Sequence, residues 1–177
     1  MNLPLFKVRL SLNAIVGMLF FSGVAHSAEV REGRCHMGSC SWYSIEETDL
    51  IASSTKGALF KVATRWWSSS HPDNDYGKRA RRTGGAIGTS YVLCSKTSPA
   101  ILSQDGTKWE VHRLSPGHSD AVFGATESAY RWYWATCHQV TASDPYNDTE
   151  RLARRFGYKV PEGAVDGSIN EPQDILR

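Results

Sequence analysis

Alternation of apolar and polar positions marks two consecutive strands in the first half of the chain. From residue 58 to residue 67, Phe60, Val62 and Trp66 alternate with Lys61 and Arg65, a spacing that puts the two kinds of side chain on opposite faces of a strand. The preceding run from residue 41 alternates less regularly, and a Ser-Ser-Thr-Lys-Gly turn at 53–57 separates the two. The pattern predicts an antiparallel hairpin.

Three further runs are typical of short strands. Apolar residues form the centre of 90–96 and of 99–103, and polar and apolar residues alternate in 108–114. A Gln-Asp-Gly sequence at 104–106 supplies a tight turn between the last two runs. We therefore expect a mainly antiparallel sheet of about five strands.

Helical spacing replaces alternation after Thr126. A mainly aromatic face recurs there at intervals of three and four residues, which predicts a helix that packs on the sheet; its members are Ala129, Tyr130, Tyr133, Trp134 and Cys137. A second short helix is predicted over 148–156, with Asp148 or Thr149 as its N-cap and Gly157 as its stop.

The predicted fold class is α+β, with the sheet covered by a disulfide-tethered C-terminal helix and a second short helix beside it. Residues 29–160 are long enough for one disulfide-bonded domain with its own core. Residues 161–177 contain two Pro and two Gly, and we expect an irregular tail there.

The first 28 residues have the order of a secretory signal peptide. Lys7 and Arg9 precede a largely apolar run at 10–25, and small residues follow it. The run is shorter than the roughly 20 apolar residues that a membrane-spanning helix needs. We expect cleavage near 25–28, a periplasmic or secreted protein, and no stable membrane anchor after cleavage.

Charge does not favour nucleic acid as a partner. The chain has 20 Lys and Arg against 18 Asp and Glu, and the leader holds two of the cations and none of the acids. The remaining residues therefore carry equal numbers of positive and negative side chains.

Four cysteines follow the predicted cleavage site, and an even number in an oxidising compartment indicates two disulfides. Three pairings are possible. We favour Cys35 with Cys40, which would close a tight loop through Gly38, and Cys94 with Cys137, which would join a strand to a helix.

A metal site is the weaker alternative for these cysteines. Cys35 and Cys137 are each followed by a histidine, His36 and His138, so thiolate and imidazole ligands could gather around zinc or copper. The spacing has no CxxC and no HxxxH, and we expect no cofactor.

Residues 68–88 combine turn residues with a cluster of cations and predict a long exposed loop. Long loops within compact domains are either functional or disordered. Trp66 and Trp67 are adjacent and would point to opposite faces of an extended strand. Either both are buried under the helix or loop, or one of them is partly exposed and forms part of a binding site. The candidate partner-binding residues are Trp66, Trp67, His71, Asp73, Asp75, Lys78, Arg79, Arg81 and Arg82.

The sequence leads us to expect a non-catalytic binding module, with an inhibitor or immunity-type protein as one form of it. The chain lacks the GxSxG, HExxH and Gly-rich phosphate-loop motifs. The expected partner is another protein or a component of the cell envelope. The rival hypothesis is a small periplasmic hydrolase that uses His71 or His118 with nearby acids.

Overall fold

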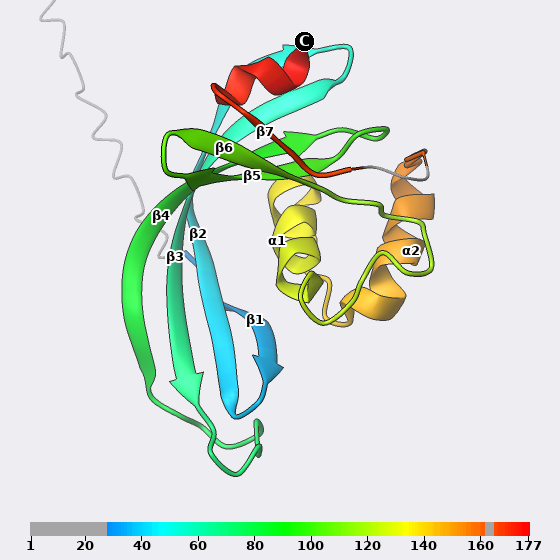
Figure 1. Cartoon of the computed structure of the whole chain (residues 1–177). Helices are drawn as coiled ribbons and strands as arrows, with labels where there is room; N and C mark the ends of the chain where they lie inside the picture. Colours follow the sequence, from blue (N-terminus) through cyan, green and yellow to red (C-terminus); the bar gives the residue numbers. More distant parts are fainter. Residues whose placement is uncertain (1–27, 162–164) are drawn as a thin grey trace, which may run out of the picture.

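In the part of the chain that the structure describes, seven strands follow one another in chain order across one antiparallel sheet (Figure 1). The computed structural model describes residues 28–161 and 165–177, so the predicted signal peptide lies outside the described residues except for Ala28. The α+β class is confirmed, but the described residues form a sheet of seven strands and not of about five. The strands are β1 (Arg31–His36), β2 (Ser39–Ser54), β3 (Gly57–Ser70), β4 (Arg82–Cys94), β5 (Ala100–Asp105), β6 (Lys108–Arg113) and β7 (Gly167–Ile169).

Both faces of the sheet bury apolar side chains, because neighbours along a strand point in opposite directions. Val92 faces a core that includes Tyr43, Val62 and the aromatic residues of the helices. Leu93, the next residue, faces a second core on the opposite side of the sheet. The members of this second core are Leu59, Leu93, Ala100, Leu102, Val111 and Ile175.

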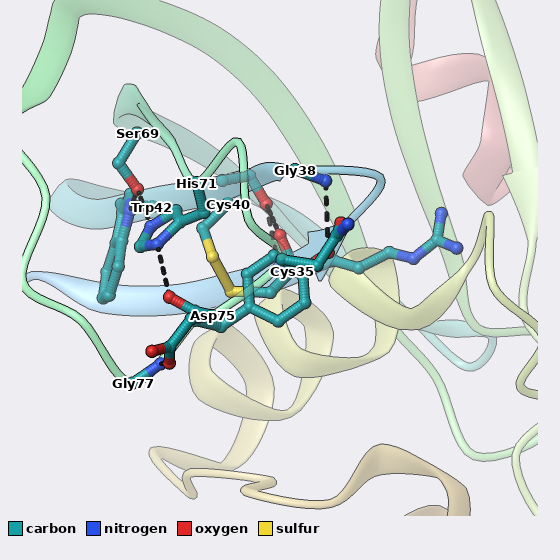
Figure 2. The surroundings of a disulfide bond; sticks show 12 residues. Cys35, Gly38, Cys40, Trp42, Ser69, His71, Asp75 and Gly77 are labelled. Atoms are coloured by element: carbon teal, nitrogen blue, oxygen red, sulfur yellow. Dashed lines mark hydrogen bonds between the residues drawn. A yellow bond between two sulfur atoms is a disulfide. The ribbon is translucent and has the colours of Figure 1, made fainter.

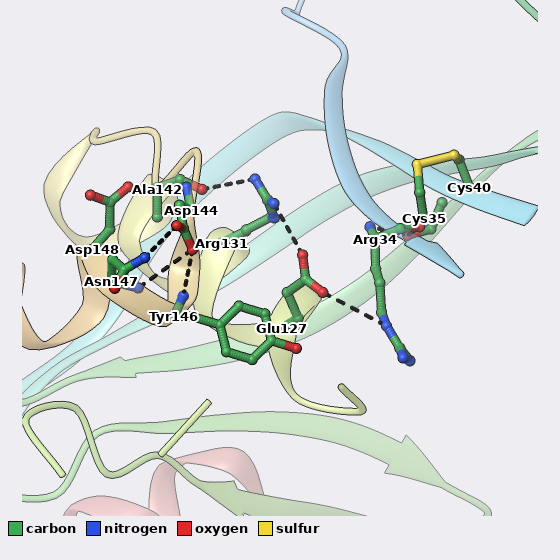
Figure 3. Close-up of polar contacts among 11 residues, drawn as sticks. Arg34, Cys35, Cys40, Glu127, Arg131, Ala142, Asp144, Tyr146, Asn147 and Asp148 are labelled. Atoms are coloured by element: carbon green, nitrogen blue, oxygen red, sulfur yellow. Dashed lines mark hydrogen bonds and ion pairs between the residues drawn. A yellow bond between two sulfur atoms is a disulfide. The ribbon is translucent and has the colours of Figure 1, made fainter. Parts of the chain in front are cut away.

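Helix α1 (Glu127–His138) covers the first of these faces, as the aromatic spacing predicts. Trp134 and Tyr133 are completely buried. The disulfide between Cys94, the last residue of β4, and Cys137 in the last turn of α1 confirms the tether. At the other end of the helix, Glu127 lies between two guanidinium groups (Figure 3), at 3.0 Å from Arg131 of α1 and 3.7 Å from Arg34 of β1. The helix is therefore fixed to the sheet at both ends.

Helix α2 (Pro145–Phe156) begins three residues earlier than the sequence predicts. Asp144 is its N-cap and accepts hydrogen bonds from the backbone N–H groups of Tyr146 and Asn147. Pro145 suits the first helical position because its missing N–H would have no partner there. Asp148, the expected cap, lies inside the first turn and pairs with Arg151.

The C-terminal segment, expected to be irregular, contributes ordered structure. Gly167–Ile169 add β7 beside β6, and Pro172–Leu176 form the short helix η1. Ile175 of η1 packs into the second core. In Figure 1, η1 (red) lies at one end of the sheet and the β1–β2 turn lies at the other. We call the end that carries the β1–β2 turn the distal end.

The predicted loop 68–88 is shorter than expected. Residues 68–70 complete β3 and residues 82–88 begin β4, so that only 71–81 connect the two strands. Ser69 pairs with Arg82 and Trp67 with Gly84. Gly85 forms a bulge beside the tryptophans, where a Cβ atom would lie 3.0 Å from Trp67 Nε1.

Within the described part of the chain, no helix combines the length and the apolarity needed to cross a membrane.

The two disulfides are expected to contribute unequally to stability. Replacing both cysteines of the long bridge with alanine (Cys94→Ala with Cys137→Ala) should lower the free energy of unfolding by about 4 kcal/mol, and the same change at Cys35 and Cys40 by about 2 kcal/mol, because the longer bridge removes more entropy from the unfolded chain. Urea unfolding of the two double variants measures both values. An equal loss, or a larger loss at the short bridge, would contradict the prediction.

Stability should also fall in mild acid because of His138. Its ring stacks on Phe156 at 3.9 Å between centroids and its Nε2 lies 2.7 Å from the Tyr158 hydroxyl. Burial, and then the charge of Lys96, lower the pKa of His138 below its ordinary value. The unfolded chain, with a histidine pKa of about 6.5, takes up the proton first, so the contribution of His138 is complete above that pH and is lost as the pH falls below it.

Thermal unfolding from pH 7.5 to pH 5 tests this effect on the wild-type chain and the His138→Gln variant. The wild-type melting temperature should fall more steeply with pH than that of the variant. Parallel profiles would show that His138 does not contribute to the pH dependence.

Candidate functional site

The β1–β2 turn and the 71–81 loop meet at the distal end of the sheet (Figure 1). Beside them is an open hollow of about 450 Å³. We call it the distal groove, and its lining residues are Trp42, His71, Tyr76, Gly77, Lys78, Arg79, Ala80, Arg81 and Arg82. Seven of them are consecutive, and Trp42 comes from the neighbouring strand β2.

A disulfide closes the β1–β2 hairpin next to the groove. Cys35 and Cys40 face each other in the register of the two strands and are bonded, as expected from their spacing. Only four residues lie between them, and His36 pairs with Ser39 across a two-residue turn. The bridge therefore holds the turn in one conformation.

His71 joins the loop to this hairpin through its backbone and its ring. Its N–H donates to the Gly38 carbonyl at 2.6 Å, and the Gly38 N–H donates to the Tyr76 hydroxyl at 3.1 Å. The ring is buried, with Nδ1 3.1 Å from the Asp75 carbonyl and Nε2 3.0 Å from Ser69 Oγ (Figure 2). A carbonyl oxygen only accepts, so Nδ1 carries a hydrogen, and in the neutral ring Nε2 accepts from the Ser69 hydroxyl.

Trp42 extends the same network to the wall of the groove. Its Nε1–H donates to Ser69 Oγ at 2.8 Å, which orients the indole beside the loop. The Arg82 guanidinium lies over this indole, 4.1 Å from the ring centroid. Trp42 and Arg82 come from the strands that flank β3. Cys40 pairs with Ser69, which pairs with Arg82, and Trp42 lies two residues after Cys40 on the same face of β2.

Charge in the groove is mainly positive. The Lys78 ammonium lies 3.7 Å from an oxygen of Asp73 and 3.4 Å from one of Asp75. The two acidic residues predicted to bind a partner are therefore both paired with this lysine. Within the described ranges, none of the ion pairs involves Arg79, Arg81 or Arg82. Three exposed or stacked guanidinium groups are therefore available to an anion.

The two tryptophans predicted to bind a partner lie outside the groove. Trp66 faces the α1 side, with its ring 5.5 Å from Tyr43 and 6.5 Å from Trp132, and 37% of it remains exposed. Trp67 points to the opposite face, where it pairs with Trp42 in the strand register and packs against Gly85. The expected division between faces is confirmed, but the aromatic wall of the groove is Trp42 and not either of these residues.

The thiolate part of the metal hypothesis is wrong, because all four cysteines are disulfide-bonded. His138 contacts Phe156 and Tyr158 at the end of α1, whereas His36 lies in β1. Among the described residues, no three His, Cys, Asp or Glu side chains gather in a way that could hold a metal ion.

Among the hydrogen bonds of the described residues, neither histidine of the hydrolase hypothesis is paired with an acid. The His118 ring lies 2.9 Å from the Val160 carbonyl, and the His71 ring faces a carbonyl in place of a carboxylate. Ser69 and His71 have the separation of a nucleophile and its base. Ser69, however, is only 3% exposed and already accepts the Trp42 N–H, so the pair joins structural elements and does not present a hydroxyl to a substrate.

Sequence reasoning found the cations of the groove and missed Trp42 and Tyr76. Trp42 could have been found from its position opposite Trp67, but that position follows only from the register of β2 and β3. No protein-family model matches this chain, and neither the curated proteins nor the solved structures gave a match.

Proposed function

We propose that this chain is an exported, non-catalytic binding module that takes an acidic surface of another protein into the distal groove. The observation that carries the proposal is a set of three arginines, Arg79, Arg81 and Arg82, beside the Trp42 indole. None of the three is paired with a carboxylate of the described residues. Arginine and aromatic side chains are the residues that most often dominate the energy of protein interfaces. Two disulfides without a free cysteine suit an oxidising compartment.

The backbone around these side chains supports binding by a preformed surface. The hairpin is closed by a disulfide, and the loop is attached to it through His71 and Tyr76. Binding of a partner then costs less conformational entropy, because the loop is already ordered in the folded protein. Inhibitor proteins commonly bind through preorganised surfaces of this kind. We therefore favour an inhibitor or immunity-type role.

Charge reversal should remove binding without unfolding the protein. Arg79→Glu with Arg81→Glu changes two exposed side chains of the groove, so we expect at least a tenfold loss of affinity, equal to about 1.4 kcal/mol, with an unchanged melting temperature. The probe is a ten-residue Glu-rich peptide, titrated with tryptophan fluorescence as the signal. High salt should also weaken binding, because the arginines are open to solvent.

The matched control is Arg151→Glu with Arg154→Glu on α2. These arginines are exposed and the substitution changes the net charge by the same amount, but they pair with Asp148 and Glu150 far from the groove in the sequence. Equal loss of affinity in the two double variants would attribute binding to net charge and contradict the proposal. Saturable binding of an anionic cell-wall polymer with no binding of the peptide would replace the protein partner by an envelope component.

A further inference from the structure

Met37 is the most exposed large apolar residue of the described chain, with 82% of its surface open to solvent. It lies at the tip of the disulfide-closed hairpin, between His36 and Gly38. The other two methionines of the sequence are Met1 and Met18, both in the predicted leader. After removal of the predicted leader, one thioether remains, at the tip of a disulfide-closed turn.

The backbone at this tip does not favour methionine. Met37 has a φ of 48° and Gly38 a φ of 73°, so both central residues of the turn are left-handed. A two-residue turn of this kind is normally built from Asn-Gly or Asp-Gly, because a longer side chain with a positive φ is strained. Local folding does not account for methionine at this position, and neither does packing, because the side chain is exposed.

The tip is nevertheless held firmly. The Cys35–Cys40 bridge closes the hairpin one residue pair behind the turn, and the His71 N–H bonds the Gly38 carbonyl at 2.6 Å. The distal groove begins in the same loop that makes this bond. An apolar knob and a positively charged groove are therefore fixed relative to each other.

We infer that Met37 is a preformed anchor that enters an apolar socket of the partner protein, while acidic residues at the rim of that socket meet the arginines of the distal groove. This rests on the proposed function and names the complementary surface. A long unbranched thioether adapts to an irregular pocket, and the bridge supplies the rigidity that the side chain lacks. A lipid surface fits less well, since the other exposed large apolar side chains, such as Leu50, Ile87 and Phe123, lie outside both distal loops.

Site-specific photocrosslinking in the native host tests the contact. A benzophenone amino acid is placed at Met37, at Arg79, or at Leu50 as a control that is 60% exposed on β2. We expect one protein adduct from positions 37 and 79 and none from position 50, with the position 37 adduct mapping to apolar residues that have Asp or Glu beside them. Lipid adducts, or equal labelling from position 50, would overturn the inference.

The pattern of adducts also separates this inference from the proposed function. An adduct from position 79 alone would leave the basic groove as the binding surface and remove Met37 from it. Absence of adducts from both positions would contradict the two proposals together.

Two changes at Met37 then test its role against the partner identified in this way. Met37→Asn suits the left-handed turn, so it should raise the melting temperature by about 2–4 °C and still weaken binding at least tenfold. A purely structural Met37 would instead give unchanged or tighter binding by this variant. Because the variant is expected to fold better than the wild type, misfolding does not explain a loss of affinity.

Peroxide provides the second change without a substitution. Hydrogen peroxide transfers one oxygen atom to the Met37 sulfur and is reduced to water, and the resulting sulfoxide is polar. Wild-type protein should gain one oxygen by mass and lose binding at least tenfold. The Met37→Leu variant has no sulfur at this position, so it should gain no oxygen and bind equally before and after the same treatment. Full binding by the oxidised wild type would overturn the inference.

Discussion

Cys94 at the end of β4 is bonded to Cys137 in the last turn of α1, and this bridge fixes which face of the sheet the helix covers. Glu127 holds the other end of α1 against Arg34 of β1. On the opposite face, η1 covers only the end near Ile175, and side chains toward the distal end, such as Trp67, remain partly open to solvent. The sheet thus has a core on each face, and the distal part of the face that carries Trp67 remains open to solvent.

That surface ends in a distal unit with few degrees of freedom. Trp42, Ser69 and His71 form a continuous set of hydrogen bonds from the wall of the groove to the loop, and Gly38 connects the loop to the disulfide-closed hairpin (Figure 2). Fully satisfied buried polar networks restrict a structure to one arrangement. This distal unit combines positive charge, one stacked indole and one exposed thioether, and the proposed recognition of a protein surface rests on these groups.

The sequence predicted those features that depend on residues close together in the chain. Alternation in β3 and helical spacing in α1 predicted the α+β class. The short spacing of Cys35 and Cys40 favoured the first bridge, and the second bridge joins the two cysteines that remained. The first half of β4 was missed because Gly84 and Gly85 show no alternation and are strand residues only through their pairing with β3. The arginines of the groove could be predicted because they are neighbours in the sequence. The contact of Trp42 with Arg82 could not be predicted, because it depends on the register of three strands.

Hydrogen exchange at the His71 amide is the most direct measure of whether the distal end is one preformed unit. This N–H donates to the Gly38 carbonyl, so in the native protein it should exchange far more slowly than an exposed loop amide such as that of Asp73. Replacement of Cys35 and Cys40 by alanine should speed its exchange and leave the amides of α1 unchanged. Exchange of the His71 amide at the rate of an unstructured peptide would show that loop and hairpin are independent, and would contradict a preformed binding surface.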